Sequence, residues 1–282
     1  MLLSESWQLY AADKRLECYS PITLQNYQLQ VKLLIRGIGD VDIGEIALPA
    51  LKTYLGAQTQ LKPSSLGQRT RTLRSFFHWA SDEGYIQANP ASRLKEPTLP
   101  ERTPKALNDE DMEALRQVCI TPFEHSLIEF FHATGCRIGE IFKLDRDGIE
   151  WNDRGCNVVG KGRGGGKQRP VFFDVTTTMW LRKYFAIRKD TDPALFVTRR
   201  APHRMSINQI RYVIKQLAER ADIKANVFPH ALRHTFAMDL LNGGAELDFV
   251  REMLGHSDLR STRIYARLTK ESLRNKYRQF RH

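Results

Sequence analysis

The sequence reads PHALRHT at residues 229–235, LGHS at 254–257 and IYA at 264–266. The apolar spacing around these segments predicts helices or helix ends. They supply guanidinium, imidazole and phenol groups, and each group has a use at a phosphodiester. Arginine grips phosphate oxygens with two hydrogen bonds, histidine moves a proton near neutral pH, and tyrosine can attack phosphorus to form a covalent intermediate. The segments therefore suit transfer chemistry on a phosphodiester.

The length and charge of the chain narrow the class of protein. With 282 residues, of which 41% are hydrophobic, the chain is predicted to form two domains with true cores. It has 43 Lys and Arg against 32 Asp and Glu, a net charge of +11, and most of this excess lies after residue 104. An isoelectric point of about 9.6 favours a polyanionic partner such as nucleic acid. Charge by itself also fits a basic protein that has no such partner.

Cysteine usage and apolar runs predict the environment of the protein. Cys18, Cys119, Cys136 and Cys156 are far apart, with no CxxC pair and no histidine at zinc-finger spacing. We therefore expect no metal site and a reducing compartment. The first residues lack a signal-peptide pattern, and no apolar run approaches the ~18 residues of a membrane span. We expect a soluble, cytoplasmic protein without a membrane partner.

Residues 1–88 are predicted to form a helical domain. A helix should start at Pro21 and end near Gly37, because proline favours helix starts and glycine favours helix ends. A longer helix should follow Ser65, with aromatic residues on its buried face and a basic cluster nearby. We expect the cluster to contact the DNA backbone, with plain solvent exposure as the alternative. Its members are Arg69, Arg71 and Arg74.

A proline-rich stretch separates this domain from the rest of the chain. Residues 89–105 lose helical periodicity and contain four prolines among charged residues, which is typical of a semi-rigid linker. A new helix should begin after Asn108, whose side chain can cap it. The second domain is therefore predicted to span residues 106–282.

A helix break and a glycine-rich hairpin bring further cations into the second domain. Gly135 interrupts an apolar helix and Arg137 follows at the resulting corner, although seen alone this is only an arginine at a helix end. Strand-like segments flank residues 160–169, which predicts a β-hairpin with a mobile, cationic tip. The loop is no nucleotide-binding P-loop, because the GxxxxGK[ST] pattern is absent. The cations of interest in it are Lys161, Arg163 and Lys167.

The helix predicted from Ser206 to Ala221 carries basic residues away from its apolar face. It starts with a capping-box pattern. Arg211 and Lys215 are candidates for contacts in a DNA groove, and simple solvent exposure is an equal alternative.

The next helix begins the segment quoted first. Pro229 can occupy its N-terminus, so His230 and Arg233 share a face where the helix dipole favours a phosphate. His256 follows the end of a later helix, and a short helix is predicted around Tyr265.

Together these segments resemble the tyrosine recombinases, a family that includes phage integrases, Xer-type recombinases and transposon resolvases. The resemblance rests on ATGCRIGEI at residues 133–141, the Gly-Lys-Gly hairpin, HALRHTFA at 230–237, LGHS at 254–257 and Tyr265. It implies a mainly α fold with a small antiparallel β-sheet. In such a fold a helical, SAM-like core-binding domain and a catalytic domain form a C-shaped clamp on duplex DNA.

The resemblance also implies roles for individual residues, without any cofactor. The residues that match the catalytic set are Arg137, Lys161, His230, Arg233, His256 and the nucleophile Tyr265. Glu140 would help to orient the site, and His234 would have a supporting role. Lys167 lies on the same hairpin as Lys161, so the choice of catalytic lysine between them stays open.

Such a protein cleaves and rejoins duplex DNA at a recombination site through a 3′-phosphotyrosyl intermediate. A C-terminal tail helix at residues 270–282 would dock on a neighbouring protomer in a homotetramer that joins two sites, or else pack on its own domain. Accessory DNA-bound copies or proteins are further partners. The role would be integration, dimer resolution or transposon cointegrate resolution. The alternatives are a type IB topoisomerase that relaxes DNA and a non-catalytic DNA-binding protein of the same fold.

We expect the affinity for DNA to fall steeply as salt rises, because each Lys or Arg contact with a phosphate releases a counterion. Fluorescence anisotropy with a labelled duplex, between about 50 and 200 mM salt, measures the effect. An affinity that stays flat over this range would contradict a nucleic-acid partner.

Overall fold

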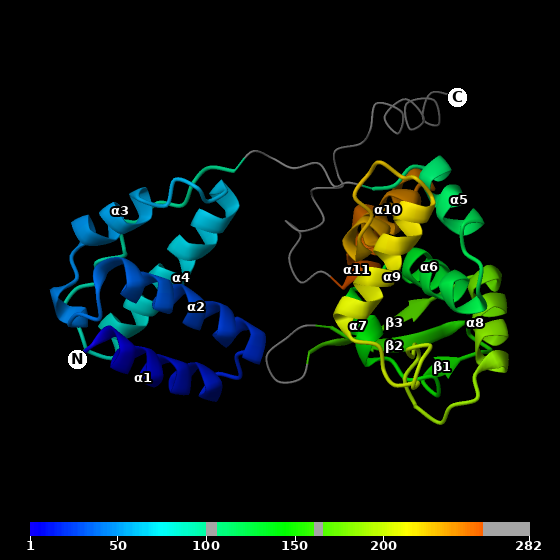
Figure 1. The fold of residues 1–282 in the computed structure, drawn as a ribbon, viewed down its shortest axis with the longest axis horizontal. Coiled ribbons are helices and arrows are strands. Elements are labelled where there is room, and N and C mark those ends of the chain that lie inside the picture. Colours follow the sequence, from blue (N-terminus) through cyan, green and yellow to red (C-terminus); the bar gives the residue numbers. More distant parts are fainter. Residues whose placement is uncertain (100–105, 161–165, 256–282) are drawn as a thin grey trace. The chain divides into compact units, whose positions relative to one another are not determined.

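The computed structural model describes residues 1–99, 106–160 and 166–255. The chain divides into two compact units, Met1–Glu101 and Arg102–His282 (Figure 1). Each unit has its own hydrophobic core. Within the described ranges, no helix combines the length and the apolar composition that crossing a bilayer requires.

The secondary-structure elements described in the first unit are all helices. Its elements are α1 (Leu3–Leu16), α2 (Pro21–Ile38), the 3₁₀-helix η1 (Ile43–Glu45), α3 (Leu48–Gly56) and α4 (Pro63–Asp82). The start of α2 is as predicted, with proline in its first turn and the Ser20 hydroxyl accepting a hydrogen bond from the Thr23 amide (3.2 Å). Aromatic rings fill the core, where Tyr10 and Phe76 meet edge to face with centroids 5.3 Å apart.

Arg69 lies inside the first unit and is only 7% exposed. Its Nε donates to Gln30 Oε1 (2.9 Å) and its Nη1 donates to Gln58 Oε1 (2.6 Å). The guanidinium also lies over the Tyr54 ring, 5.8 Å from the ring centroid. The prediction that Arg69 contacts DNA is therefore wrong, because its charged group is buried and bound within the unit.

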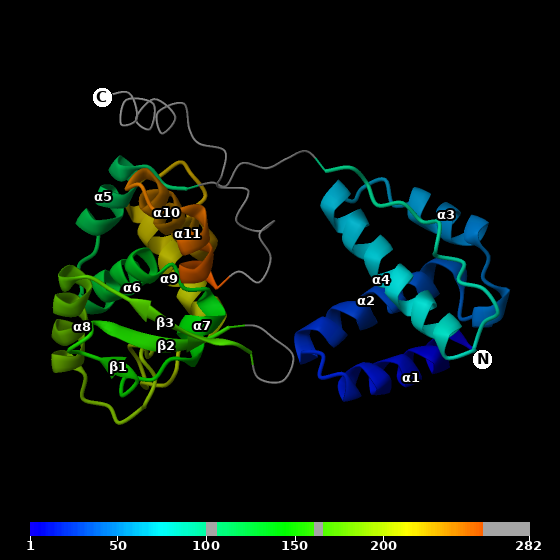
Figure 2. The same cartoon turned by 180° about the vertical axis from the view of Figure 1, so that it is seen from behind.

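The second unit combines helices with one small sheet. Its elements are α5 (Asp109–Gln117), α6 (Pro122–Thr134), α7 (Ile138–Lys143), β1 (Ile149–Glu150), β2 (Gly155–Val159), β3 (Gln168–Phe172), α8 (Val175–Ile187), α9 (Ile207–Arg220), α10 (Pro229–Asn242) and α11 (Leu247–Leu254). The strands are antiparallel in the order β1–β2–β3, which Figure 2 shows from behind. In the β2–β3 pair, Val158 lies opposite Arg169. The predicted fold class, mainly α with a small antiparallel sheet, is confirmed.

Side chains at the helix starts of the second unit follow the predicted capping pattern. The Asn108 side chain accepts a hydrogen bond from the Asp111 amide (2.7 Å) at the start of α5. At α9, the Ser206 hydroxyl accepts from the Gln209 amide (3.2 Å), and the Gln209 side chain accepts from the Ser206 amide (2.7 Å). These bonds satisfy amides that have no partner within the helix.

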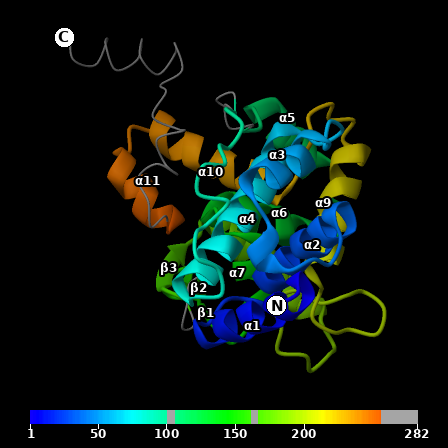
Figure 3. The same cartoon turned by 90° about the vertical axis from the view of Figure 1, so that its left-hand side faces the viewer.

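Helix α6 lies at the centre of the second unit's core. Its side chains Leu127, Phe130 and Phe131 are fully buried, and the helix packs against both α8 and α10. Helix α11 lies beside α10 (Figure 3). The two helices pack through a smaller apolar cluster that includes Phe236 and Val250. Burial of these apolar faces fixes the ends of α6, α10 and α11 relative to one another.

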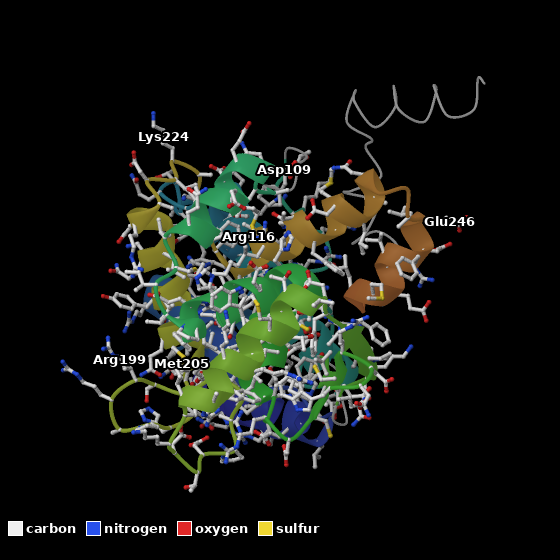
Figure 4. The ribbon with its side chains drawn as sticks, turned by 90° about the vertical axis from the view of Figure 1, so that its right-hand side faces the viewer. Asp109, Arg116, Arg199, Met205, Lys224 and Glu246 are labelled. Carbon is white, nitrogen blue, oxygen red and sulfur yellow. The ribbon has the colours of Figure 1, made fainter. Side chains whose placement is uncertain are left out.

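Polar contacts connect α5 and α10 to α6. Arg116, which is labelled beside α5 in Figure 4, donates to both carboxylate oxygens of Glu129 at 2.8 and 3.2 Å. The side chain of Glu129 is only 3% exposed. One turn further along α6, the His132 ring lies 3.0 Å from the Asp239 carboxylate on α10. Since a buried carboxylate is stable only when it is paired, Arg116 stabilises the packing of α5 on α6.

We expect Arg116→Ala to lower the free energy of unfolding by about 2–3 kcal/mol, because it leaves the Glu129 carboxylate buried without its guanidinium. This value is smaller than the ~3–5 kcal/mol typical of a fully buried pair because Arg116 is 34% exposed. The control Arg251→Ala removes an exposed partner of Asp248 and should cost below about 1 kcal/mol. Urea unfolding followed by circular dichroism measures both. Equal losses of unfolding free energy would show that the ion pair with Arg116 is not needed to keep Glu129 buried.

Candidate active site

The break between α6 and α7 fixes the backbone at Arg137. Helix α6 ends at Gly135 with φ +57°, a left-handed conformation that favours glycine. A Cβ atom at this position would lie 2.2 Å from the ring of Phe236, so a side chain has no room there. Arg137 then caps α7 in an extended conformation, with φ −71° and ψ 146°. The predicted corner between two helices is confirmed.

Glu140 holds Arg137 from two sides. Its Oε2 accepts a hydrogen bond from the Arg137 backbone amide (2.7 Å), and its Oε1 accepts one from Arg137 Nη1 (2.9 Å). The Glu140 side chain is 3% exposed and the Arg137 side chain is 24% exposed. The carboxylate therefore fixes both the backbone and the guanidinium of Arg137, while part of the guanidinium stays accessible.

Arg169 on β3 is a third member of this group. Its Nη2 donates to Glu140 Oε2 at 2.8 Å, and its side chain is 10% exposed. In the sequence, Arg169 ends the predicted cationic loop of residues 160–169, and it has no predicted role in the site. No local pattern could have found this contact, because Glu140 lies in another element, far away in the sequence.

Arg233 on α10 connects the ends of two other helices. It is 4% exposed, its Nη1 donates to the Gly135 carbonyl (2.7 Å), and its Nη2 donates to the Leu254 carbonyl (2.6 Å). Gly135 follows α6 and Leu254 is the last residue of α11. The final carbonyls of a helix lack partners within it and carry a partial negative charge, so a buried cation is favourable at these positions.

The arginines meet at the end of α11. Arg137 Nη2 donates to the Gly255 carbonyl (3.3 Å), one residue beyond the carbonyl that Arg233 binds. Gly255 has φ +62°, and a Cβ atom there would lie 2.5 Å from Arg169 Nε. The structure thus brings Arg137, Arg169 and Arg233 to two consecutive residues of α11 and its cap.

His230 and His234 lie one turn apart on α10. His230 is in the first turn and exposed, whereas His234 is partly buried. Burial, together with the nearby positive charges of His230 and Arg233, lowers the pKa of His234 to about 4. The His234 imidazole is therefore neutral at pH 7.

A pocket of about 250 Å³ opens beside His230. Arg211 and Lys215 of α9 line it, together with Ile138, the residue after Arg137. Two predicted DNA contacts thus share a pocket with a predicted catalytic histidine. Cations from α9 and the N-terminal end of α10 would both favour an anionic group in this pocket.

The other predicted DNA contacts of the first unit lie on the exposed side of α4. The side chains of Arg71 and Arg74 are 58% and 49% exposed, and both approach the Glu96 carboxylate, at 2.9 and 3.7 Å. Two guanidiniums facing one carboxylate leave a positive charge on this surface.

Several predicted site residues lie outside the described part of the chain. These are Lys161, Arg163, His256 and Tyr265. Lys167 is described and exposed, and its carbonyl accepts a hydrogen bond from the Gly160 amide (3.0 Å) at the base of the hairpin. Within residues 1–99, 106–160 and 166–255, no three His, Cys, Asp or Glu side chains are grouped so that they could hold a metal ion.

Comparison with known sequences identifies the family. The Phage integrase family matches residues 105–272. The tyrosine recombinase XerD of Ralstonia nicotianae is 36% identical over 241 residues, which cover 81% of this chain and 77% of that protein. The tyrosine recombinase XerC of Oceanobacillus iheyensis is 32% identical over 277 residues, which cover 92% of this chain and 89% of that protein.

Solved structures of recombinases share the fold. A lambda integrase dimer bound to a COC′ core site has a TM-score of 0.78 at 18% identity, over 94% of this chain and 95% of that one. The XerH site-specific recombinase bound to a palindromic difH substrate has a TM-score of 0.76 at 18% identity, over 98% of this chain and 85% of that one. The sequence matches, the shared fold and the arginines gathered at the end of α11 agree with the predicted resemblance. The chain therefore belongs to the phage integrase family and is a tyrosine recombinase.

Proposed function

We propose that this enzyme cleaves and rejoins duplex DNA at a specific site through a 3′-phosphotyrosyl intermediate. The observation that supports this most is the meeting of two arginines from distant segments. Arg137 and Arg233 bind the consecutive carbonyls of Gly255 and Leu254, at 3.3 and 2.6 Å. Two guanidiniums held in place before the reaction suit a five-coordinate phosphorus, whose non-bridging oxygens carry extra negative charge.

The proposed covalent step moves phosphorus from one oxygen to another. The Tyr265 oxygen forms a bond to the scissile phosphorus while the bond to the 5′-oxygen breaks. A tyrosine with its ordinary pKa of about 10 is protonated at neutral pH, so its proton passes to His230 during the attack. A hairpin lysine, Lys161 or Lys167, donates a proton to the departing 5′-oxygen, and His256 hydrogen-bonds a non-bridging oxygen.

The step conserves bond energy because one phosphodiester replaces another of similar energy. No nucleotide cofactor is then required, and attack by a 5′-hydroxyl of a partner strand on the phosphotyrosyl bond reverses the step. Such reversal with a different strand is recombination.

In this proposal residues 1–88 form the DNA-binding domain, residues 89–105 form the linker, and residues 106–282 form the catalytic domain. Lysine and arginine contacts with phosphates would position the enzyme on the duplex. The exposure of Arg71 and Arg74, and the pocket that Arg211 and Lys215 share with His230, support this arrangement. The proposed contacts are Arg71, Arg74, Arg163, Lys167, Arg211 and Lys215.

We further assign the enzyme to a homotetramer that joins two recombination sites through the tail at residues 270–282. Its role is dimer resolution, transposon cointegrate resolution or integration. The relatives named XerC and XerD and the XerH structure with a difH substrate support action at a defined site. A plasmid that carries two copies of the site should lose the intervening segment, whereas relaxation of any plasmid without strand exchange would favour a topoisomerase.

We expect wild-type protein to form a covalent adduct with a nicked duplex, and Tyr265→Phe to form none while it still binds, because only the phenol can become esterified. The duplex would carry a site selected from random DNA by binding to the protein. Denaturing gel electrophoresis detects the adduct, and a mobility-shift assay measures binding.

Tyr277→Phe is the matched control, since it removes another phenol from the same end of the chain, and it should leave the adduct intact. An adduct that persists in Tyr265→Phe would refute the assignment of the nucleophile. Binding by the wild-type protein without any adduct would favour a non-catalytic DNA-binding protein.

We also expect stability to depend on pH through His234. Its pKa in the folded protein is about 4, below the ordinary value of about 6.5 in an unfolded chain. The unfolded state therefore binds more protons between these values, so stability should be complete above about pH 6.5 and should fall as the pH drops towards 4. His234→Gln should flatten the free energy of unfolding against pH in this window.

Urea unfolding at several pH values between 7 and 4.5 measures the slope. His203→Gln removes an exposed imidazole from the same unit and serves as the control, which should keep the wild-type slope. An unchanged slope in His234→Gln would mean that His234 does not contribute.

A further inference from the structure

Arg169 lies in the candidate site with its side chain 10% exposed. It has no role in the proposed chemistry. Its Nε and Nη1 atoms are buried and have no hydrogen-bond partner among the described residues. Its Nη2 donates to Glu140 Oε2 at 2.8 Å. Buried donors without partners are rare and costly, so their presence next to an active site calls for a functional explanation.

Arg169 packs directly on the backbone that Arg137 binds. A Cβ atom on Gly255 would lie 2.5 Å from Arg169 Nε and 2.7 Å from its Cδ, so the guanidinium rests where a side chain would otherwise be. The Gly255 carbonyl is the acceptor for Arg137 Nη2. Two groups hold the Arg137 guanidinium, the Gly255 carbonyl and the Glu140 carboxylate. Arg169 thus supports the first of them.

Arg169 also binds Glu140, the second group that holds the Arg137 guanidinium. Glu140 Oε2 receives hydrogen bonds from both Arg169 Nη2 and the Arg137 amide, and Glu140 Oε1 receives one from Arg137 Nη1. One carboxylate that is 3% exposed therefore faces two guanidiniums. Without Arg169, the negative charge of Glu140 would be matched by Arg137 alone, and Arg137 would attract a phosphate less strongly.

We propose that Arg169 is a positioning residue of the recombinase reaction, which holds Glu140 and the Gly255 backbone and balances the Glu140 charge so that Arg137 keeps its positive charge for the scissile phosphate. This inference rests on the proposed function, in which Arg137 stabilises the phosphorus centre. Arg169 itself touches neither the DNA nor the reacting atoms in this scheme.

Single-turnover formation of the covalent adduct on the nicked duplex, at saturating protein, tests the proposal. Arg169→Gln should slow adduct formation about 10- to 100-fold, since small misplacements of a catalytic group cost this much. The dissociation constant for the duplex and the melting temperature should change little. Arg169→Lys keeps the charge and should recover part of the rate. Arg182→Gln removes an exposed cation of the same unit and should keep the wild-type rate.

A double-mutant cycle with Glu140→Gln shows whether Arg169 acts through Glu140. A neutral amide at position 140 needs no balancing charge, so Arg169→Gln should cost less than about threefold in that background. An equal loss in both backgrounds would overturn the proposal, as would a wild-type rate in Arg169→Gln. A loss that only follows weaker binding or a lower melting temperature would assign Arg169 a structural role and also overturn it.

Where Arg169→Gln does not fold, Arg169→Lys in the two Glu140 backgrounds gives the same comparison. The result for the wild-type protein shows whether a failure concerns this inference or the proposed function. Absence of any wild-type adduct refutes the function and the inference together. A wild-type adduct with an unimpaired Arg169→Gln refutes the inference alone.

Discussion

The candidate active site depends on one buried carboxylate. Glu140 is 3% exposed, and its two oxygens receive the Arg137 amide, the Arg137 guanidinium and the Arg169 guanidinium. A carboxylate can stay charged in such a place only if cations and amides replace the water it has lost. Its partners come from the start of α7 and from β3, so the hairpin and the helix corner must both form before the charge is satisfied.

Two helix ends complete the arrangement. Gly135 ends α6 and Gly255 ends α11, both in the left-handed conformation. The carbonyls at these ends have no helical partner, and Arg233 binds one at each end. Arg137 binds the carbonyl of Gly255 itself. The guanidiniums are thus held by backbone atoms of packed helices, which move less than side chains, and this suits a site that must be organised before its substrate arrives.

Local sequence patterns predicted much of the fold. The caps at Asn108 and Ser206, the end of α6 at Gly135 and the β-hairpin follow from short-range rules, since capping and turn formation involve residues a few positions apart. The same rules failed for Arg69. A basic residue at the edge of an apolar helix face can point to solvent or into the domain. Here Arg69 points inward, where two glutamines, one from α2 and one from the segment after α3, bind it.

The sequence by itself determined the type of most of the longer elements, the charge of the protein, the recombinase family and the chemical groups available to the site. Only the tertiary structure decided which groups meet: Arg137 with the Gly255 carbonyl, 118 residues away, and Arg169 with Glu140, 29 residues away. The physical reason is that such contacts are set by how apolar helix faces pack, here α6 against α10 and α10 against α11. Packing of that kind leaves no signature in the residues next to either partner.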